Sequence, residues 1–268
     1  MDINYPRRIL LAEIKKQYRN YNRNLASFMS LIIWPLLSFL SIYYIYESFD
    51  LSVLHNFNIN SKKDFIIFIT SGTLVYNCFW VSVQSAFEIL EERQNGTIEF
   101  VFLSPVNRLL LMYAKAFGCL YSSLGLLIIF SIIIVLTMEI TAIVIFKILL
   151  LLVLITFCSM IWGGFINVFF LISRDSTFVF TVCDEPMRFF SGSMVPVNTF
   201  PFVFKAISIV FPATHCTKLV QTVLLGEKTT FMNYFGLFLS LASTFIITFI
   251  LMRKAERQNM NTGNLQLY

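Results

Sequence analysis

Two groups of residues in this chain have the types and spacing that could carry chemistry. The first is Asp184, Glu185 and Arg188, three ionisable residues inside an otherwise apolar stretch. Arg188 lies four residues after Asp184 and three after Glu185, so a helix would allow an internal ion pair. The second group is the polar segment at residues 88–108. Carboxylates inside apolar segments are costly and usually functional, which makes Asp184 and Glu185 the first candidates.

The residue sets of common enzymes are missing from the sequence. There is no HExxH or GxSxG motif, and His55 and His215 lack carboxylate or thiol neighbours at ligand spacing. We therefore expect neither a metal site nor an intramembrane enzyme. No GxxxxGKS/T motif is present to hold nucleotide phosphates, so we expect no cofactor in this chain and no ATP hydrolysis by it.

The composition predicts that membrane-spanning helices position these residues. Of 268 residues, 57% are hydrophobic and 13% are charged, and the mean hydropathy is +0.75. Soluble domains average roughly 45–50% apolar and about 25% charged residues. Five uncharged runs are each long enough to cross a bilayer as a helix, and residues 176–195 are a sixth, weaker candidate. The five runs are 24–46, 65–87, 116–138, 148–173 and 229–252, of 23, 23, 23, 26 and 24 residues.

The Lys and Arg residues predict the orientation of six spans. With the N-terminus inside, segments 1–23, 88–115, 174–175 and 253–268 are cytoplasmic and hold 13 of the 20 basic residues. Basic residues favour the cytoplasmic side. We therefore expect an all-α integral membrane protein of the cell membrane, with six transmembrane helices and both termini in the cytoplasm. The net charge of +5 then indicates contact with anionic membrane lipid, not nucleic acid.

The spans predict a single transmembrane domain over residues 1–268. Its six-span core covers residues 25–252, and residues 253–268 form a cytoplasmic tail. Within the core, residues 193–225 consist of two short apolar stretches interrupted by three prolines. We expect them to form an outer re-entrant helical hairpin, an arrangement that is tolerated where protein covers it.

Residues 1–24 are expected to form a cytoplasmic interface helix. Leu10, Ile14 and Tyr18 recur at helical spacing, and basic residues occupy much of the remaining surface. An amphipathic helix of this kind lies in the membrane interface. Its basic residues are Arg7, Arg8, Lys15, Lys16 and Arg19.

The segment 88–115 is too apolar in its middle to be a simple loop. Asn95-Gly96 should end the helix that continues from the second span. A short apolar helix should follow from Thr97 to Leu103, with Thr97 as its cap, and Ser104-Pro105 should stop it. Such a short helix between two breaks suits a rigid knob that fits a cleft on another protein.

The acidic pair lies deep in the predicted fifth span. Asp184 and Glu185 follow about nine residues of helix, which corresponds to about 13 Å and places them near the bilayer midplane. Three roles stay open for them: a self-neutralised structural pair with Arg188 at a subunit contact, part of a substrate path, or a proton relay.

Taken together, these segments resemble a known family. The stretch Glu91–Glu99, followed by Leu103–Arg108, resembles the E-R-x-x-G-T-x-E…S/T-P-x-x-R signature of type-2 ABC exporter permeases. The resemblance covers the whole chain, and its P-x-T-H run is similar to the drug and lipo-oligosaccharide export branch. The downstream residues that carry it are Ser191-Gly192, Pro196, Pro201, Phe211-Pro212-Ala213-Thr214-His215 and Leu224-Leu225-Gly226.

The resemblance implies a role for each element. The chain would be the membrane permease subunit of an exporter, and the short helix would be the coupling helix that fits a separate ABC ATPase subunit. That partner would bind the ATP and Mg. The residues implied in coupling are Glu91, Glu92, Arg93, Gly96, Thr97, Glu99, Ser104, Pro105 and Arg108.

The resemblance also implies a pair of permeases and a class of cargo. A second copy or a sister permease would pair through the first and fifth spans, and the path would lie between them. The cargo would be amphiphilic: a drug-like molecule, a lipid-linked glycan or a peptide. Asp184-Glu185 departs from the family pattern, which argues against a purely apolar path.

An ion-coupled secondary carrier is the competing hypothesis. It would use Asp184, Glu185 and Arg188 and would need no ATPase, whereas the long segment 88–115 favours the exporter. Frequent Phe, Ile and Asn indicate an AT-rich bacterial source.

Overall fold

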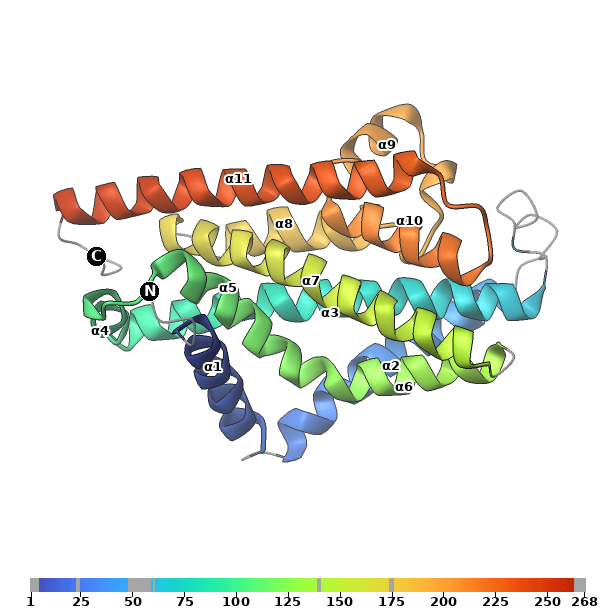
Figure 1. The fold of residues 1–268 in the computed structure, drawn as a ribbon, viewed down its shortest axis with the longest axis horizontal. Coiled ribbons are helices and arrows are strands. Elements are labelled where there is room, and N and C mark those ends of the chain that lie inside the picture. The colour runs from blue at the N-terminus through green and yellow to red at the C-terminus, as the bar shows by residue number, and fades with distance from the viewer. Residues whose placement is uncertain are drawn as a thin grey trace.

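The computed structural model describes residues 5–22, 25–47, 59, 61–138, 141–173 and 176–262. These residues form helices and connecting turns and contain no strand. The longest helices run roughly along one axis, so the molecule is an elongated bundle (Figure 1). The predicted all-α fold class is therefore confirmed.

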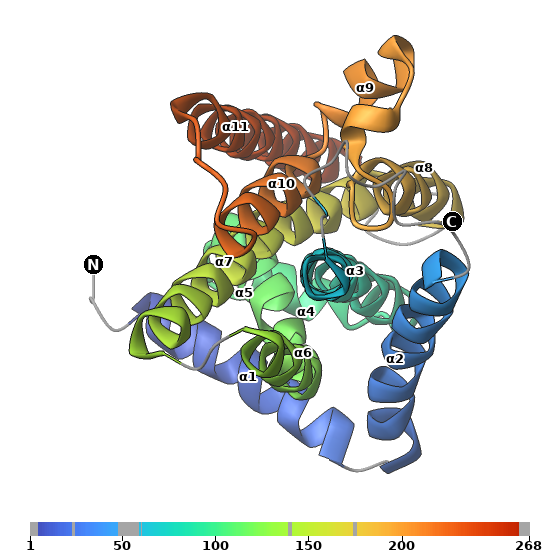
Figure 2. The same cartoon turned by 90° about the vertical axis from the view of Figure 1, so that its right-hand side faces the viewer.

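The helices are labelled in Figure 1 in chain order. The first, α1, crosses the bundle obliquely, as the views in Figures 1 and 2 both show. A 3-10 turn, Leu120–Ser123, joins α5 to α6. The bounds are α1 Tyr5–Asn22, α2 Leu25–Glu47, α3 Lys62–Gln94, α4 Ile98–Leu103, α5 Arg108–Cys119, α6 Leu124–Thr137, α7 Ala142–Ile172, α8 Ser176–Phe190, α9 Phe202–Ser208, α10 Pro212–Leu224 and α11 Phe231–Thr262.

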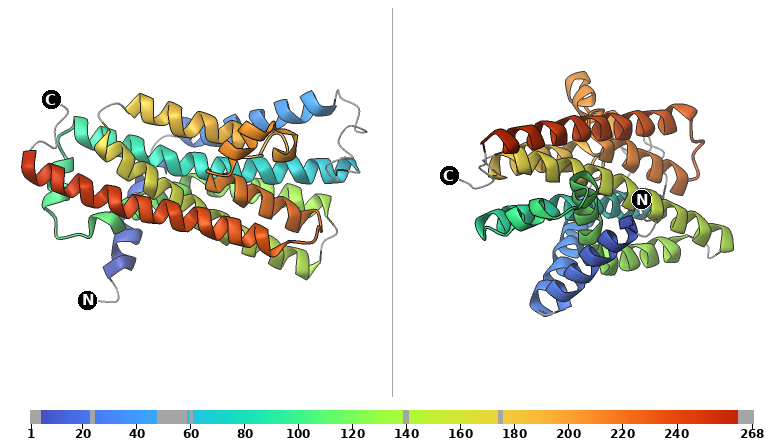
Figure 3. Two further views of the ribbon diagram at one scale, coloured as in Figure 1. Left: turned by 90° about the horizontal axis from the view of Figure 1, so that it is seen from above. Right: turned by 60° about the vertical axis from the view of Figure 1, so that its left-hand side comes forward.

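One end of the bundle, here called the α4 end, gathers segments from the whole chain. Figure 3 shows that α4 and the last turns of α11 lie at this end. The first turn of α1 reaches it as well, because the hydroxyl of Tyr5 donates a hydrogen bond to the carbonyl of Pro105, 3.2 Å away. The first turn of α1, the short helix α4 and the last described turns of α11 therefore come together.

The centre of the bundle is α3. Figure 2 looks along the bundle and shows α3 surrounded by α2, α6, α7, α8 and α10, each of which contacts it. In its most apolar stretch, 83% of the residues are buried, against 44% for the α5–α6 helix and 28% for both α7 and α11.

The burial of α3 runs opposite to its hydropathy. The mean hydropathy of its most apolar stretch is 1.6, the lowest of these four helices, whereas the corresponding stretch of α7 reaches 2.8. This order is expected in a bilayer, because lipid tails accommodate apolar side chains as readily as protein does, and contacts between helices favour small and polar residues instead. The small buried residues of α3 include Ser71, Gly72, Ser82 and Ser85.

Two glycines of α7 allow it to approach α3 and α5 closely. A Cβ atom on Gly163 would lie 2.7 Å from the Cβ of Ser82 and 2.8 Å from the Cβ of Ala116. A Cβ on Gly164 would collide with the ring of Tyr113. Any larger residue at these two positions would force the three helices apart.

A buried amide ties the same three helices together. The hydroxyl of Ser85 on α3 donates a hydrogen bond to Oδ1 of Asn167 on α7 over 2.8 Å. Nδ2 of Asn167 in turn donates to the carbonyl of Met112 on α5, also over 2.8 Å. Side-chain hydrogen bonds between helices stabilise membrane bundles by roughly 0.6 kcal/mol on average and up to about 2 kcal/mol.

Among the described residues, four helices are long and apolar enough to cross a membrane: α3, the α5–α6 helix, α7 and α11. The α9–α10 pair would make a fifth if it counts as one span, but the chain bends by 94° between the two helices. The structure therefore supports four or five spans within the described residues.

The predicted count of six spans is not confirmed. The described apolar part of α2 is Ile32–Ile45, and α8 has only 15 residues, whereas a helix needs about 20 to cross a bilayer. The bend between α9 and α10 occurs where a re-entrant hairpin was predicted, and the same bend would also fit a broken span.

Replacing Gly163 tests the packing of α3 against α5 and α7. We expect Gly163→Leu to destabilise the protein by about 1–3 kcal/mol or more, because an overpacked interior must shift backbone. The change would appear as a lower melting temperature in detergent. Val153→Leu on the same helix is the control, since Val153 is 70% exposed and should tolerate the extra carbon. Equal melting temperatures for both variants would contradict this packing.

Candidate functional site

The first candidate site is the α4 end, where two breaks isolate a six-residue helix. α3 ends at Gln94, and Gly96 follows in the left-handed region with φ of 67°. α4 then runs from Ile98 to Leu103 and ends at Ser104. The predicted short helix and both of its breaks are confirmed.

The predicted capping role of Thr97 is wrong. Its backbone is helical, with φ of −80° and ψ of −16°, and its side chain makes no capping hydrogen bond. An N-cap side chain reaches the helix amides from an extended backbone, which Thr97 does not have. The hydroxyl of Thr97 instead donates to the carbonyl of Glu92 over 3.1 Å. Thr97 therefore ties α4 back to the end of α3.

α4 has one buried face and one exposed face. Ile98 is only 2% exposed and packs in a small apolar cluster, the α4 base cluster, with residues of α3, α5, α7 and α11. Phe100 and Leu103 are 74% and 81% exposed. The helix is thus anchored from below and presents an apolar tip. The α4 base cluster consists of Ile89, Ile98, Met112, Val168, Leu171, Met252 and Ala255.

A cluster of opposite charges lies beside α4. Oε1 of Glu92 on α3 accepts from the ammonium of Lys115 on α5 at 2.5 Å and from that of Lys16 on α1 at 3.1 Å. Lys16 also pairs with Glu88 at 2.8 Å, and Gln17 donates to Glu88 as well. Two carboxylates of α3 therefore hold α1 and α5 together.

The ion pairs of the cluster are shielded from water to different degrees. The side chain of Lys115 is 2% exposed and that of Glu92 is 19% exposed, while that of Lys16 is 36% exposed. Burial disfavours the charge of Lys16, but the carboxylates of Glu88, Glu92 and Glu13 outweigh it and raise the pKa of Lys16 above its usual range. Burial raises the pKa of Glu13. The closest of these ion pairs, at 2.5–3.1 Å, all use the two α3 carboxylates.

Arg93 closes the end of α7. Its guanidinium donates to the carbonyl of Leu171 over 2.5 Å and to that of Ser173 over 3.2 Å. The last carbonyls of a helix lack partners within the helix and carry partial negative charge, so a cation there is favourable. Arg93 therefore links the C-terminal ends of α3 and α7.

Further contacts fix the segment after α4. The hydroxyl of Tyr5 on α1 accepts from the backbone N–H of Asn107 over 2.9 Å, in addition to its bond to Pro105. Arg108, the first residue of α5, pairs with Glu256 on α11 at 3.5 Å. The turn from α4 to α5 is thus held by helices from both ends of the chain.

The predicted coupling residues divide into inward-facing and outward-facing groups. Glu92 and Arg93 have the partners described above, while Glu91 is exposed. Glu99 lies on α4, but its side chain falls outside the described part of the structure. Of the predicted interface residues, only Lys16 turns inward, and Arg7, Arg8, Lys15 and Arg19 are exposed.

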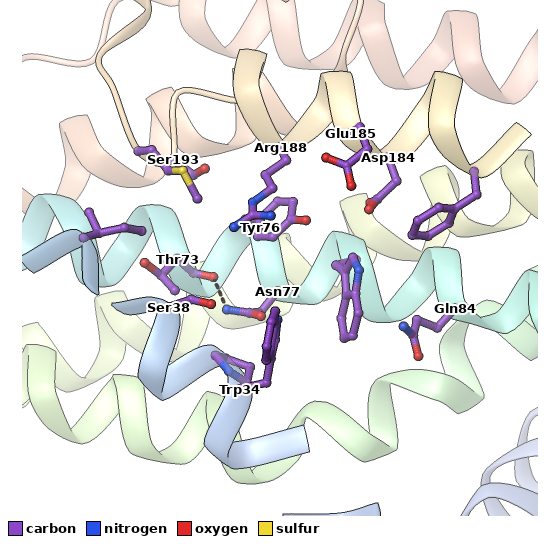
Figure 4. A pocket seen from close by; sticks show the side chains of 15 residues that line it. Trp34, Ser38, Thr73, Tyr76, Asn77, Gln84, Asp184, Glu185, Arg188 and Ser193 are labelled. Carbon is purple, nitrogen blue, oxygen red and sulfur yellow. Dashed lines mark hydrogen bonds between the residues drawn. The ribbon is translucent and has the colours of Figure 1, made fainter. Parts of the chain in front are cut away.

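The second candidate site is a pocket of about 500 Å³ between α2, α3 and α8 (Figure 4). α2 and α8 both pack on α3, and the pocket lies at the middle of α3, from Thr73 to Gln84. Its lining combines aromatic and ionisable side chains. The lining residues are Trp34, Pro35, Ser38, Ile42, Thr73, Tyr76, Asn77, Trp80, Gln84, Phe180, Asp184, Glu185, Arg188, Ser193 and Met194.

The acidic pair and Arg188 all reach this pocket, but they do not neutralise one another. Figure 4 shows Asp184 and Glu185 pointing from α8 towards α3, with Arg188 further along α8 beside Tyr76. Among the described residues, no ion pair joins either carboxylate to Arg188. Oδ1 of Asp184 is buried and has no hydrogen-bond partner in the part of the chain that the structure describes. The internal ion pair that the spacing allows is therefore not formed.

Sequence reasoning missed several residues of both sites. The roles of Lys115 and Glu88 could not be read from the sequence, because their partners, Glu92 and Lys16, lie on other elements. Tyr76 and Trp80, four residues apart on α3, face the pocket together. Their helical spacing was the available signal.

Removing the charge of Glu92 tests the charge cluster. We expect Glu92→Gln to destabilise the protein by about 3 kcal/mol, because it leaves Lys115 buried without its carboxylate. The double variant Glu92→Gln with Lys115→Met should recover much of the loss, and Glu91→Gln, at the exposed neighbour, should change little. The free energy of unfolding in mixed detergent micelles would be measured for the three variants and compared with that of the wild-type chain. A stable Glu92→Gln variant would contradict the role of the cluster.

The comparisons with known proteins agree with this arrangement. A family model described as ABC-2 type transporter matches residues 8–225, from α1 through α10. A comparison with curated proteins returned no match. The matched region is more than half of the chain and includes α4, the charge cluster and the pocket. The chain therefore belongs to the ABC-2 type transporter family, whose members are membrane permeases.

Proposed function

We propose that this chain is the permease subunit of an ABC exporter, driven by a separate ATPase that docks at the α4 end. In this proposal the chain crosses the cell membrane of a bacterium six times, through α2, α3, the α5–α6 helix, α7, α8 and α11. The α4 end is cytoplasmic, which agrees with the basic exposed surface of α1. The bent α9–α10 pair is re-entrant from the outer side.

The exposed apolar tip of α4 carries this proposal. Phe100 and Leu103 are three residues apart on one helix face and lie 74% and 81% exposed at the end where the membrane would meet the cytoplasm. Large apolar side chains at the centre of an interface contribute most to binding. A short rigid helix that presents them suits a cleft on an ATPase.

The contacts beneath α4 would carry motion into the membrane. Ile98 connects α4 to α3, α5, α7 and α11 through the α4 base cluster. The backbone carbonyl of Glu92 accepts a hydrogen bond from the hydroxyl of Thr97. The carboxylate of Glu92 pairs with Lys16 of α1 and Lys115 of α5. A displacement of α4 by ATP binding in the partner would therefore move several spans together.

The pocket between α2, α3 and α8 would be part of the cargo path. It is bounded by the proposed first and fifth spans, α2 and α8. A second copy or a sister permease would pair with these helices and enclose the path. The cargo in this proposal is amphiphilic, because the pocket combines aromatic rings with ionisable groups.

An ion-coupled carrier is the second candidate, and the observation that favours it is the buried oxygen of Asp184 that has no hydrogen-bond partner among the described residues. Such a carrier would respond to a proton gradient and need no ATPase. Uptake into vesicles that hold the gradient but no ATP would support the carrier. Uptake that requires ATP and persists after the gradient is collapsed would support the exporter.

A charged residue on the tip of α4 tests the coupling role. We expect Leu103→Glu, and separately Phe100→Glu, to weaken association with the ATPase by at least about tenfold, because a buried unpaired charge would be placed in an apolar contact. The tagged chain would be purified from its native membranes in mild detergent, and the co-purifying ATPase and its activity would be measured.

The control is Arg257→Gln, an exposed position at the same end on α11. It should retain the ATPase, as should the wild-type chain. A wild-type preparation without any ATPase, even in lipid discs, would overturn the exporter. Full association of both tip variants would show that the ATPase docks elsewhere.

A further inference from the structure

We infer that the pocket binds an organic cation, an amphiphile whose positive group sits against Asp184 and Glu185. Its apolar part lies against the aromatic rings of α2 and α3. The inference rests on the proposed function, because it names the class of cargo that the same path would carry. The observations that support it are an unpaired carboxylate, the charge balance of the pocket and its aromatic lining.

Asp184 is a buried acid, and one of its carboxyl oxygens has no hydrogen-bond partner among the described residues. The residue is 2% exposed, lines the pocket, and its Oδ1 makes no hydrogen bond. Leaving such a group uncompensated costs free energy, and ionising it there costs more. A cation delivered into the pocket would supply the missing partner, and the carboxylate would gain more from it in these surroundings than in water.

The charge balance of the pocket favours a cation over an anion. Glu185 lines the same pocket and is exposed to it, so two carboxylates face a single guanidinium, that of Arg188. Arg188 pairs with neither carboxylate among the described residues and lies further along α8 (Figure 4). The carboxyl groups therefore stay available, and the lining holds two acidic groups against one basic group.

The aromatic lining suits the remainder of such a molecule. Tyr76 and Trp80 come from consecutive turns of α3, and Trp34 comes from α2 across the pocket. Aromatic faces attract cations within about 6 Å and also pack against apolar groups. A neutral or anionic amphiphile could use the rings, but it would leave Asp184 unpaired.

The size of the pocket fits a compact organic cation. Its volume of about 500 Å³ lies within the range of roughly 300–1,000 Å³ that holds drug-sized ligands. Tetraphenylphosphonium is a suitable probe, because tetraphenylborate has the same shape and opposite charge. The pair separates recognition of charge from recognition of size and apolar surface.

Binding of both probes to the permease–ATPase complex in lipid discs tests the inference, with empty discs to subtract partition into lipid. We expect tetraphenylphosphonium to bind at least about tenfold more tightly than tetraphenylborate. Asp184→Asn should remove about tenfold or more of that affinity, the size expected for one charge-assisted contact. Asp184→Glu, which keeps the charge, should retain the preference for the cation.

Two further variants keep the test decisive. Glu185→Gln should also weaken binding of the cation and is the variant to use if Asp184→Asn fails to fold. Glu256→Gln is the matched control, because it removes a carboxylate at the α4 end, away from the pocket. Equal binding of both probes by the wild-type complex, or an undiminished preference in Asp184→Asn and Glu185→Gln, would overturn the inference.

The outcomes also separate this inference from the proposed function. If the ATPase co-purifies but the pocket does not discriminate between the probes, the exporter stands and the cargo is of another class. If the isolated chain binds the cation through Asp184 but no ATPase accompanies it, the exporter fails and the pocket belongs to a carrier.

Discussion

The arrangement of the whole bundle depends on how closely other helices can approach α3. In a bilayer, apolar side chains gain little by leaving lipid for protein, so packing must come from close contact and internal hydrogen bonds. The contacts of Gly163 with Ser82 and Ala116 supply the first, and the bridge from Ser85 through Asn167 supplies the second. The helices with the highest hydropathy, α7 and the α5–α6 helix, are free to face lipid because α3 provides their inner contact.

At the α4 end, the charge cluster holds the helices together in place of close packing. There the helices leave the apolar region, so close packing alone no longer decides how they meet. Glu92 pairs with both Lys16 and Lys115, and Arg93 donates to the carbonyls of Leu171 and Ser173 at the end of α7. The result is a framework of α1, α3, α5 and α7 around the α4 base cluster. A displacement of α4 would therefore move these helices with it instead of deforming α4 alone.

The sequence predicted the elements better than their partners. Uncharged runs located α3, α6, α7 and α11, and Asn95-Gly96 and Ser104-Pro105 correctly bounded α4, because these signals are local. The stretch 176–195 was longer than the helix that formed in it, because α8 has 15 residues, Ser176–Phe190, which include the three ionisable side chains. The pairing of Lys16 with Glu88 joins residues 72 positions apart, and no local pattern distinguishes such a lysine from one that faces lipid. The Asp184–Arg188 spacing allowed a pair that the side chains do not form.

Consecutive charges on one helix cannot all serve the same partner, and this limits what the signature at residues 91–93 can do. Successive residues of an α-helix point about 100° apart. Glu91 accordingly faces outward, Glu92 faces α1 and α5, and Arg93 faces the end of α7. Contact with an ATPase would then fall mainly to Glu91 and the apolar tip of α4. Glu92 and Arg93 instead fix α1, α5 and α7 around the end of α3, beneath that tip. A motif that resembles a docking surface therefore consists in large part of internal contacts between helices.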